Sequence, residues 1–193
     1  VLHFDLPVRR ALETVGTYDE IFIPARLMEP STTNGAGSET HEYASNDMNH
    51  YVLLFDGSAQ DESAEFNLVM PPAWDRSTIK FKALWAPGHA DANVDEYIKL
   101  SLAAGAFSND DGLDDSLGTA QDVTDQVIAD DDLHITAASS AITVAGSPTL
   151  GDLVHFKLTR DYDYAGGGTA MDVDLRLIGI VIQYQKTNEV AAW

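Results

Sequence analysis

The sequence predicts an all-β protein, an antiparallel β-sandwich or jelly roll of about eight to ten strands with an N-terminal arm. Short segments alternate between apolar and polar residues with a period of two, and they are rich in β-branched and aromatic side chains. Clusters of glycine, proline, asparagine and aspartate separate these segments at roughly regular intervals. No segment has the apolar periodicity of a long helix, and no internal repeat indicates a propeller or a solenoid.

The first predicted strands occupy residues 18–25, 51–55 and 64–70. Each one alternates or is almost wholly apolar, which is typical of a strand with at least one buried face. A proline stops the first strand, an Asp-Gly pair follows the second, and paired prolines follow the third. The polar residues 28–47 are expected to form an exposed excursion between the first two strands.

Residues 78–85 show the clearest alternation in the N-terminal half, with the apolar side chains on one face and Lys80 and Lys82 on the other. Residues 97–103 alternate in the same way. Further short strands are predicted at residues 122–128, 133–137 and 141–145. Long loops are expected at residues 34–47, 88–95 and 108–132, with a short helical turn at residues 113–117.

The C-terminal stretch, residues 152–185, contains two long alternating runs joined by three consecutive glycines, and it predicts a long hairpin. The second run is apolar on both faces: Ile178, Ile180, Ile182 and Tyr184 share one face, and Val173, Leu175, Leu177 and Val181 share the other. A strand covered on both sides belongs inside a sandwich, a barrel or a subunit interface.

Arginine and aspartate lie close together at the turn end of this hairpin. We expect Arg160 to lie near Asp172 or Asp174 across the ladder, in ion pairs within the chain or between subunits. The predicted subunit interface consists of Arg160, Asp174, Arg176, Ile178, Ile180, Ile182 and Tyr184. Such an interface predicts a homo-oligomer, because a symmetric ring would cover the apolar face.

Length and composition indicate one domain, residues 18–193, preceded by an arm at residues 1–17. An apolar content of 45% suffices for a full core without metals or disulfides, and the chain contains no cysteine. No apolar run approaches the length of a membrane span. The first residues do not resemble a secretory signal.

The net charge of −20 comes from 31 acidic and 11 basic residues, and it disfavours binding to nucleic acid. Residues 108–132 alone contain nine aspartates. A solvated acidic surface is one interpretation of this stretch. The alternative is a calcium site formed by Asp110, Asp111, Asp114 and Asp115, although the spacing of an EF-hand is missing.

The sequence contains none of the motifs that carry common enzyme chemistry. GxSxG, a P-loop, GxGxxG before a helix and HExxH are all missing. No two histidines have the spacing that places a pair of imidazoles on one metal ion. We therefore expect a protein that is not an enzyme and needs no cofactor.

Two segments resemble small virion proteins of tailed phages and prophages. The matching positions in the first segment are Pro71, Trp74, Asp75, Thr78, Ile79 and Trp85. Those in the second are Gly151, Asp152, Val154, Phe156, Arg160, Asp161, Asp172, Leu177, Gly179, Ile182 and Tyr184. The resemblance covers roughly residues 55–184 and implies a β-rich module on the capsid exterior or the tail, commonly trimeric.

This resemblance implies a virion structural protein, made in the host cytoplasm, that stabilises the particle as a capsid decoration (cement or head-fibre) protein. Its partners would be copies of itself and the major capsid protein. The alternative is a tail-associated receptor- or carbohydrate-binding module that uses the exposed loops at residues 34–47 or 88–95. A third reading is a glycan-active enzyme on a β-sandwich.

Overall fold

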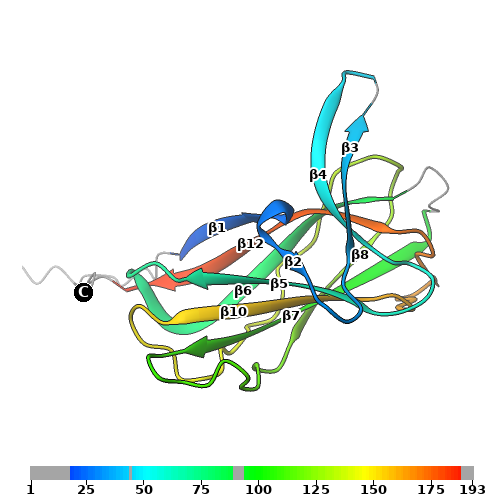
Figure 1. The fold of residues 1–193 in the computed structure, drawn as a ribbon. Coiled ribbons are helices and arrows are strands. Elements are labelled where there is room, and N and C mark those ends of the chain that lie inside the picture. The colour runs from blue at the N-terminus through cyan, green and yellow to red at the C-terminus, as the bar shows by residue number, and fades with distance from the viewer. Residues whose placement is uncertain (1–17, 44, 89–93, 188–193) are drawn as a thin grey trace, which may run out of the picture.

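The computed structural model describes residues 18–43, 45–88 and 94–187, so the predicted arm at residues 1–17 lies outside the described residues. The described chain is an antiparallel β-sandwich of two sheets, as the sequence predicts (Figure 1). A single turn of 3-10 helix, η1 (Ala25–Leu27), follows the first strand. The described residues include no helix that is long and apolar enough to cross a membrane.

Sheet A has the strand order β3-β4-β12-β6-β9, with β1 also paired to β12. Its strands are β1 (Tyr18–Pro24), β3 (Gly37–Tyr43), β4 (Met48–Phe55), β6 (Trp74–Pro87), β9 (His134–Ile135) and β12 (Leu175–Lys186). Sheet B has the order β11-β7-β10-β5-β2, with β8 also paired to β7. Its strands are β2 (Glu29–Pro30), β5 (Glu62–Val69), β7 (Glu96–Phe107), β8 (Gln121–Gln126), β10 (Leu153–Asp161) and β11 (Thr169–Ala170).

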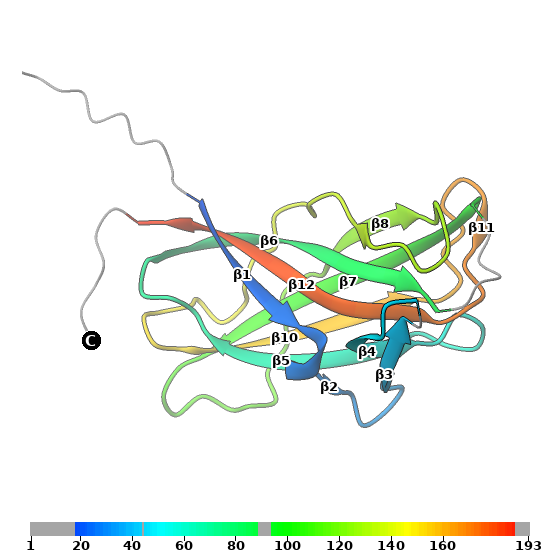
Figure 2. The same ribbon diagram turned by 90° about the horizontal axis from the view of Figure 1, so that it is seen from above.

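Successive long strands alternate between the two sheets. The chain passes from β4 in sheet A to β5 in sheet B, back to β6, across again to β7, and from β10 and β11 back to β12. This alternation gives the jelly-roll arrangement, and Figure 2 shows the two layers from above.

The core lies between the layers and is built from the inward-facing half of each alternating strand. Phe66 of β5 and Phe156 of β10 stack in sheet B with ring centroids 4.6 Å apart. From sheet A, Phe81 and Trp85 of β6 are fully buried in the same core. The period-two pattern in the sequence therefore identifies the core face of these strands correctly.

The predicted C-terminal hairpin is wrong. The run that becomes β10 pairs with β5 and β7 in sheet B, whereas the run that becomes β12 pairs with β1, β4 and β6 in sheet A. The two strands therefore lie in different sheets, and their buried faces meet in one core between the sheets. The glycine stretch leads into β11 and a crossover between the sheets.

A β-bulge explains why β12 reads as apolar on both faces. The register against β6 shifts between Leu177 and Gly179. One extra residue reverses the alternation, so Leu177 before the bulge and Ile180 after it both face the core. The prediction of two apolar faces is therefore wrong: β12 has one core face, and the alternation of core and outward residues shifts by one position at the bulge.

The predicted loop at residues 34–47 is also wrong, because residues 37–43 form β3. Its sequence is polar, yet it pairs with β4 in full register from Gly37↔Leu54 to Tyr43↔Met48. Pairing with a neighbour can impose a strand on residues of weak β propensity. The β3–β4 ribbon projects from the body because β12 pairs with β4 only over its first three residues, and β1 takes that place beyond (Figure 1).

Smaller corrections concern the acidic middle of the chain. No helical turn forms at residues 113–117. The strand predicted at residues 122–128 is confirmed by β8, so the long loop expected at residues 108–132 ends earlier than its predicted bound. Residues 141–145 make isolated bridges instead of a strand. Residues 89–93 of the predicted loop 88–95 lie outside the described part of the chain.

Candidate functional site

The outer face of sheet B carries a groove of about 410 Å³. Its floor is formed by the polar faces of β5 and β10, whose alternate residues point away from the core. His155 of β10 lies between Asn67 and Gly105, and Lys157 lies between Glu65 and Ala103. The small residues on β7 leave room beside these longer side chains.

The connection from β7 to β8 forms one wall of the groove. Leu113, Asp114, Asp115 and Leu117 line it from this side. A Cβ at Gly105 would lie 3.0 Å from Cδ2 of Leu117, so glycine lets the wall approach the sheet closely.

A hydrogen-bonded network holds the polar side chains on the floor. Glu65 accepts a hydrogen bond of 2.6 Å from the Ser31 hydroxyl, and its carboxylate lies 3.5 Å from Lys157 Nζ and 3.3 Å from His155 Nε2. Nδ1 of His155 lies 3.0 Å from Oδ1 of Asn67. Burial would raise the pKa of Glu65, but the Ser31 hydroxyl, Lys157 and His155 hold that pKa below its usual value.

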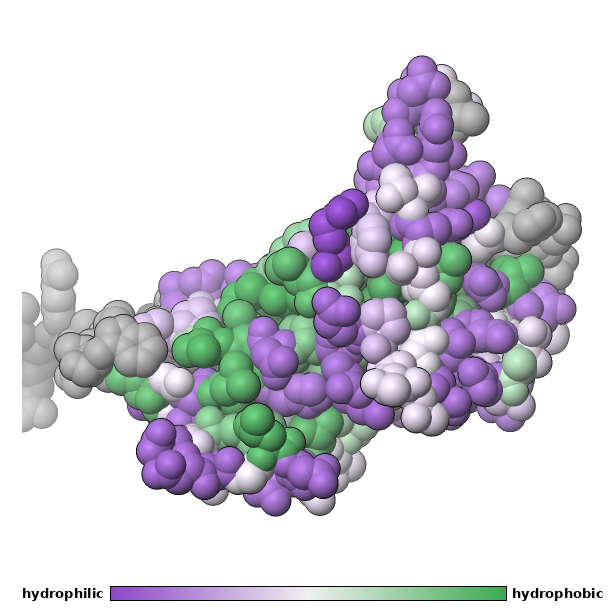
Figure 3. Space-filling model, viewed as in Figure 1, coloured by the Kyte–Doolittle hydropathy of each residue, from purple (hydrophilic) through white to green (hydrophobic). Residues whose placement is uncertain are grey.

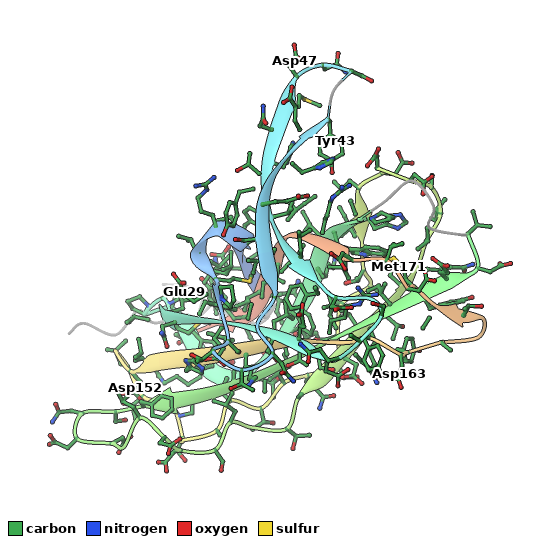
Figure 4. The ribbon with its side chains drawn as sticks, turned by 45° about the vertical axis from the view of Figure 1, so that its right-hand side comes forward. Glu29, Tyr43, Asp47, Asp152, Asp163 and Met171 are labelled. Atoms are coloured by element: carbon green, nitrogen blue, oxygen red, sulfur yellow. The ribbon has the colours of Figure 1, made fainter. Side chains whose placement is uncertain are left out.

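The wall is anchored at its start by Asp152, which lies near the end of the molecule where this connection begins (Figure 4). The Asp152 carboxylate accepts hydrogen bonds from the Ser108 hydroxyl at 2.9 Å and from the Thr149 N–H and hydroxyl at 2.6 and 2.9 Å. Burial would raise the pKa of Asp152, and these three donors hold it below its usual value. Asp152 is a positioning residue for the wall.

The groove combines hydrogen-bonding groups with accessible apolar surface. Lys157 and Asn67 supply donors, Glu65, Asn67 and Asp114 supply acceptors, and Leu113 is 78% exposed at the rim. Its volume lies within the range of small-molecule sites. This mixture suits a ligand with many hydroxyl groups and an apolar carbon face.

The predicted calcium ligands do not converge on one point. Asp114 and Asp115 line the groove, Asp111 accepts the Ser108 N–H at 2.7 Å, and Asp110 accepts the side-chain N–H of its neighbour Asn109. In the described part of the chain, no three His, Asp or Glu side chains form a group that could hold a metal ion.

The predicted interface residues on β12 are mostly inside the sandwich. Ile180, Ile182 and Tyr184 belong to the core, with at most 4% of each residue exposed. The bulge turns them inward, so their side chains have no surface to offer a partner subunit. Ile178 alone of the four apolar residues faces outward, in a hollow on sheet A.

Arg160 is buried, and it bonds to backbone oxygens instead of the carboxylates predicted for it. Its guanidinium donates to the carbonyls of Phe55, Val173 and Met171 at 2.7, 3.0 and 2.5 Å. Burial lowers the pKa of Arg160 to about 10, against the opposing effect of Asp174 and other nearby acids. Arg160 therefore joins the end of β4 to the segment that enters β12.

Arg176, one of the predicted interface residues, forms ion pairs within the chain. Its Nε lies 3.3 Å from Glu39 of β3, and its Nη1 lies 3.2 Å from Asp131. Asp174 is exposed, and its carbonyl accepts the Gly88 N–H at 2.6 Å. The Arg176–Glu39 pair joins β12 to β3 near the base of the β3–β4 ribbon.

The sequence reasoning missed the groove. The signal available was the polar face of β5 and β10, where Glu65, Asn67, His155 and Lys157 alternate with core residues. Their meeting depends on the pairing of two strands that are 84 or more positions apart, and on a loop folded over them. Neither feature can be read from local spacing.

No protein-family model and no curated protein matches the sequence. Solved structures with a similar strand arrangement include a xylan-binding module, CBM15, at 8% identity and a TM-score of 0.45, covering 89% of this chain and 99% of that one. A family 11 carbohydrate-binding module from Clostridium thermocellum shows 12% identity and a TM-score of 0.41 over 84% of this chain and 94% of its own. A Stig cyclase from Fischerella sp. TAU shows 13% identity and a TM-score of 0.41, with 93% of both chains covered. Similarities this weak carry no conclusion about function.

Proposed function

We propose that this chain is a non-catalytic carbohydrate-binding module whose ligand lies in the groove on sheet B. The observation that supports the proposal is the groove itself: about 410 Å³ of open volume with held donors and acceptors on its floor and leucines on its wall. Sugar hydroxyls both donate and accept, and sugar rings present C–H faces, so such a lining matches both properties. In the described part of the chain, no residue of the ranges 34–47 and 88–95 lines this groove.

The groove favours a neutral or a positively charged glycan over an acidic one. Glu65, Asp114 and Asp115 line it together with a single lysine, Lys157, which already lies beside Glu65. The net charge of −20 adds a repulsive field for polyanions.

Binding to a panel of soluble polysaccharides, measured by retardation in affinity gels and by calorimetry, tests this proposal. For the best ligand, Asn67→Ala and Lys157→Ala are each expected to lower the association constant by about tenfold, because each removes a donor worth about 1–2 kcal/mol. The control is Thr78→Ala, an exposed change on the other sheet, which should leave binding unchanged. Absence of binding to every glycan, or equal losses in all three variants, would contradict the proposal.

A second candidate is a virion structural subunit, a capsid decoration protein that contacts the major capsid protein and copies of itself. The outer face of sheet A supports it, because Phe22, Met48, Leu133 and Ile135 are each half exposed or more. Decoration requires many copies per particle and adds binding energy to the closed shell. Quantitative mass spectrometry of purified particles, combined with heating of particles that lack the protein, tests this candidate.

A further inference from the structure

The outer face of sheet A has an apolar centre. Leu84 of β6 points outward there, directly opposite Ile135 of β9, which is 56% exposed. Beside them a hollow of about 250 Å³ is lined by Tyr43, Met48, His50, Leu84, Asp131, Leu133 and Ile178. Exposed apolar groups gathered around a hollow indicate a surface that another protein covers.

Charges of opposite sign lie at the two ends of this centre. Lys80 and Lys82 precede Leu84 on the same outward face of β6, and no ion pair joins either of them to an acid in the described residues. At the other end, Asp131 and Asp132 lead into β9, and β9 runs antiparallel to β6. Asp131 already pairs with Arg176, so the exposed Asp132 is the acid that faces a partner. The order along the surface is therefore basic, apolar, acidic.

We propose that a second copy of this chain covers this surface in a two-fold symmetric dimer. A two-fold axis near Leu84 and Ile135 places the basic end of one copy against the acidic end of the other, twice. The surface thus contains its own charge complement, although the chain has only 11 bases against 31 acids. Lys82 would contact Asp132 of the other copy, and Leu84 and Ile135 of the two copies would pack against each other at the axis.

Each copy brings a net charge of −20, so long-range repulsion opposes the dimer at low ionic strength. Salt screens this repulsion over distances beyond about 10 Å and weakens close pairs less when they are partly buried. The dimer is therefore expected to be stronger in about 0.15 M salt than in about 0.01 M salt.

Sedimentation velocity of the full chain at about 1 to 100 µM measures the dimer directly. Lys82→Glu and Asp132→Lys are each expected to raise the dimer dissociation constant by about tenfold or more, and the double variant is expected to recover most of that loss. Leu84→Asp should abolish the dimer. The control Val69→Glu replaces an exposed apolar residue on sheet B and should leave the dissociation constant unchanged.

Circular dichroism and the thermal midpoint of each variant show whether it is folded. A monomer at every concentration, a trimer, a double variant no better than either single one, or an equal effect of Val69→Glu would each overturn the proposal. The charge reversal keeps it testable even if Leu84→Asp unfolds, because Lys82 and Asp132 lie on the surface and outside the core.

Discussion

At the scale of single residues, two buried polar side chains hold distant segments together. The Arg160 guanidinium satisfies three carbonyls near the crossover into β12, and a planar group with five donors can reach all of them at once. The Asp152 carboxylate accepts hydrogen bonds from Ser108 and Thr149 and so fixes the start of the groove wall. Both residues find their partners within the chain.

Arg160→Met is expected to lower the free energy of unfolding by about 3 kcal/mol or more, because it leaves buried carbonyls without donors. Arg160→Lys should recover only part of the loss, since an ammonium cannot match the planar fork. Urea denaturation followed by tryptophan fluorescence measures both values. The control is Arg76→Met, an exposed arginine; a loss as small as in that control would contradict the assigned role.

We expect Asp152 to stabilise the folded chain by an amount that depends on pH. Its pKa is lower in the folded chain than in the unfolded chain, where it is about 3.9. Its contribution is therefore fully present above that unfolded value and is lost as the pH falls through the folded pKa. Asp152→Asn should be less stable than the parent at about pH 6, and the difference should shrink towards about pH 2. Urea midpoints at several pH values test this, and a constant difference would count against it.

At the scale of elements, the bulge in β12 decides how sheet A is built. Gly179 follows it, where β1 reaches the last pair of its ladder. A Cβ on Gly179 would lie 2.6 Å from the Ile23 carbonyl oxygen and 2.7 Å from the Phe22 ring. Glycine is thus required for β1 to lie close to β12, and β4 leaves β12 at the point where β1 takes its place as the neighbouring strand.

Gly179→Ala is expected to lower the free energy of unfolding by about 2 kcal/mol, because the added methyl group forces β1 away from β12. Gly167→Ala is the matched control, since nothing lies within 4 Å of a Cβ there. Thermal unfolding of both variants gives the comparison. If the two midpoints fall equally, close packing at Gly179 does not explain its presence.

The elements also show what local sequence can predict. Alternation located most long strands, including β6 and β10, because one face of each is buried and the other is not. It missed β3, a polar strand formed by pairing, and it placed β10 and β12 in one hairpin. Which strands pair depends on contacts across the core between distant parts of the chain. A bulge also shifts the apolar–polar alternation by one residue, so the alternation no longer marks a single face of the strand.

At the scale of the whole molecule, the two outer faces differ in character. Sheet B presents hydrogen-bonded polar side chains beside the β7–β8 connection, whereas sheet A presents an apolar centre flanked by charged residues. Figure 3 shows the projecting β3–β4 ribbon as largely hydrophilic, while hydrophobic residues gather on the body beside β1 and η1. We assign ligand binding to the first face and self-association to the second, so each can be removed without the other.

The central claim is that the groove between β5, β10 and the β7–β8 connection binds a glycan. Nuclear magnetic resonance titration of the isotopically labelled full chain with the oligosaccharide that binds best tests it most directly. The largest shift changes are expected on Asn67, His155, Lys157 and residues 113–117, with sheet A unaffected. Shift changes centred on sheet A or on the β3–β4 ribbon, with the groove unchanged, would contradict it.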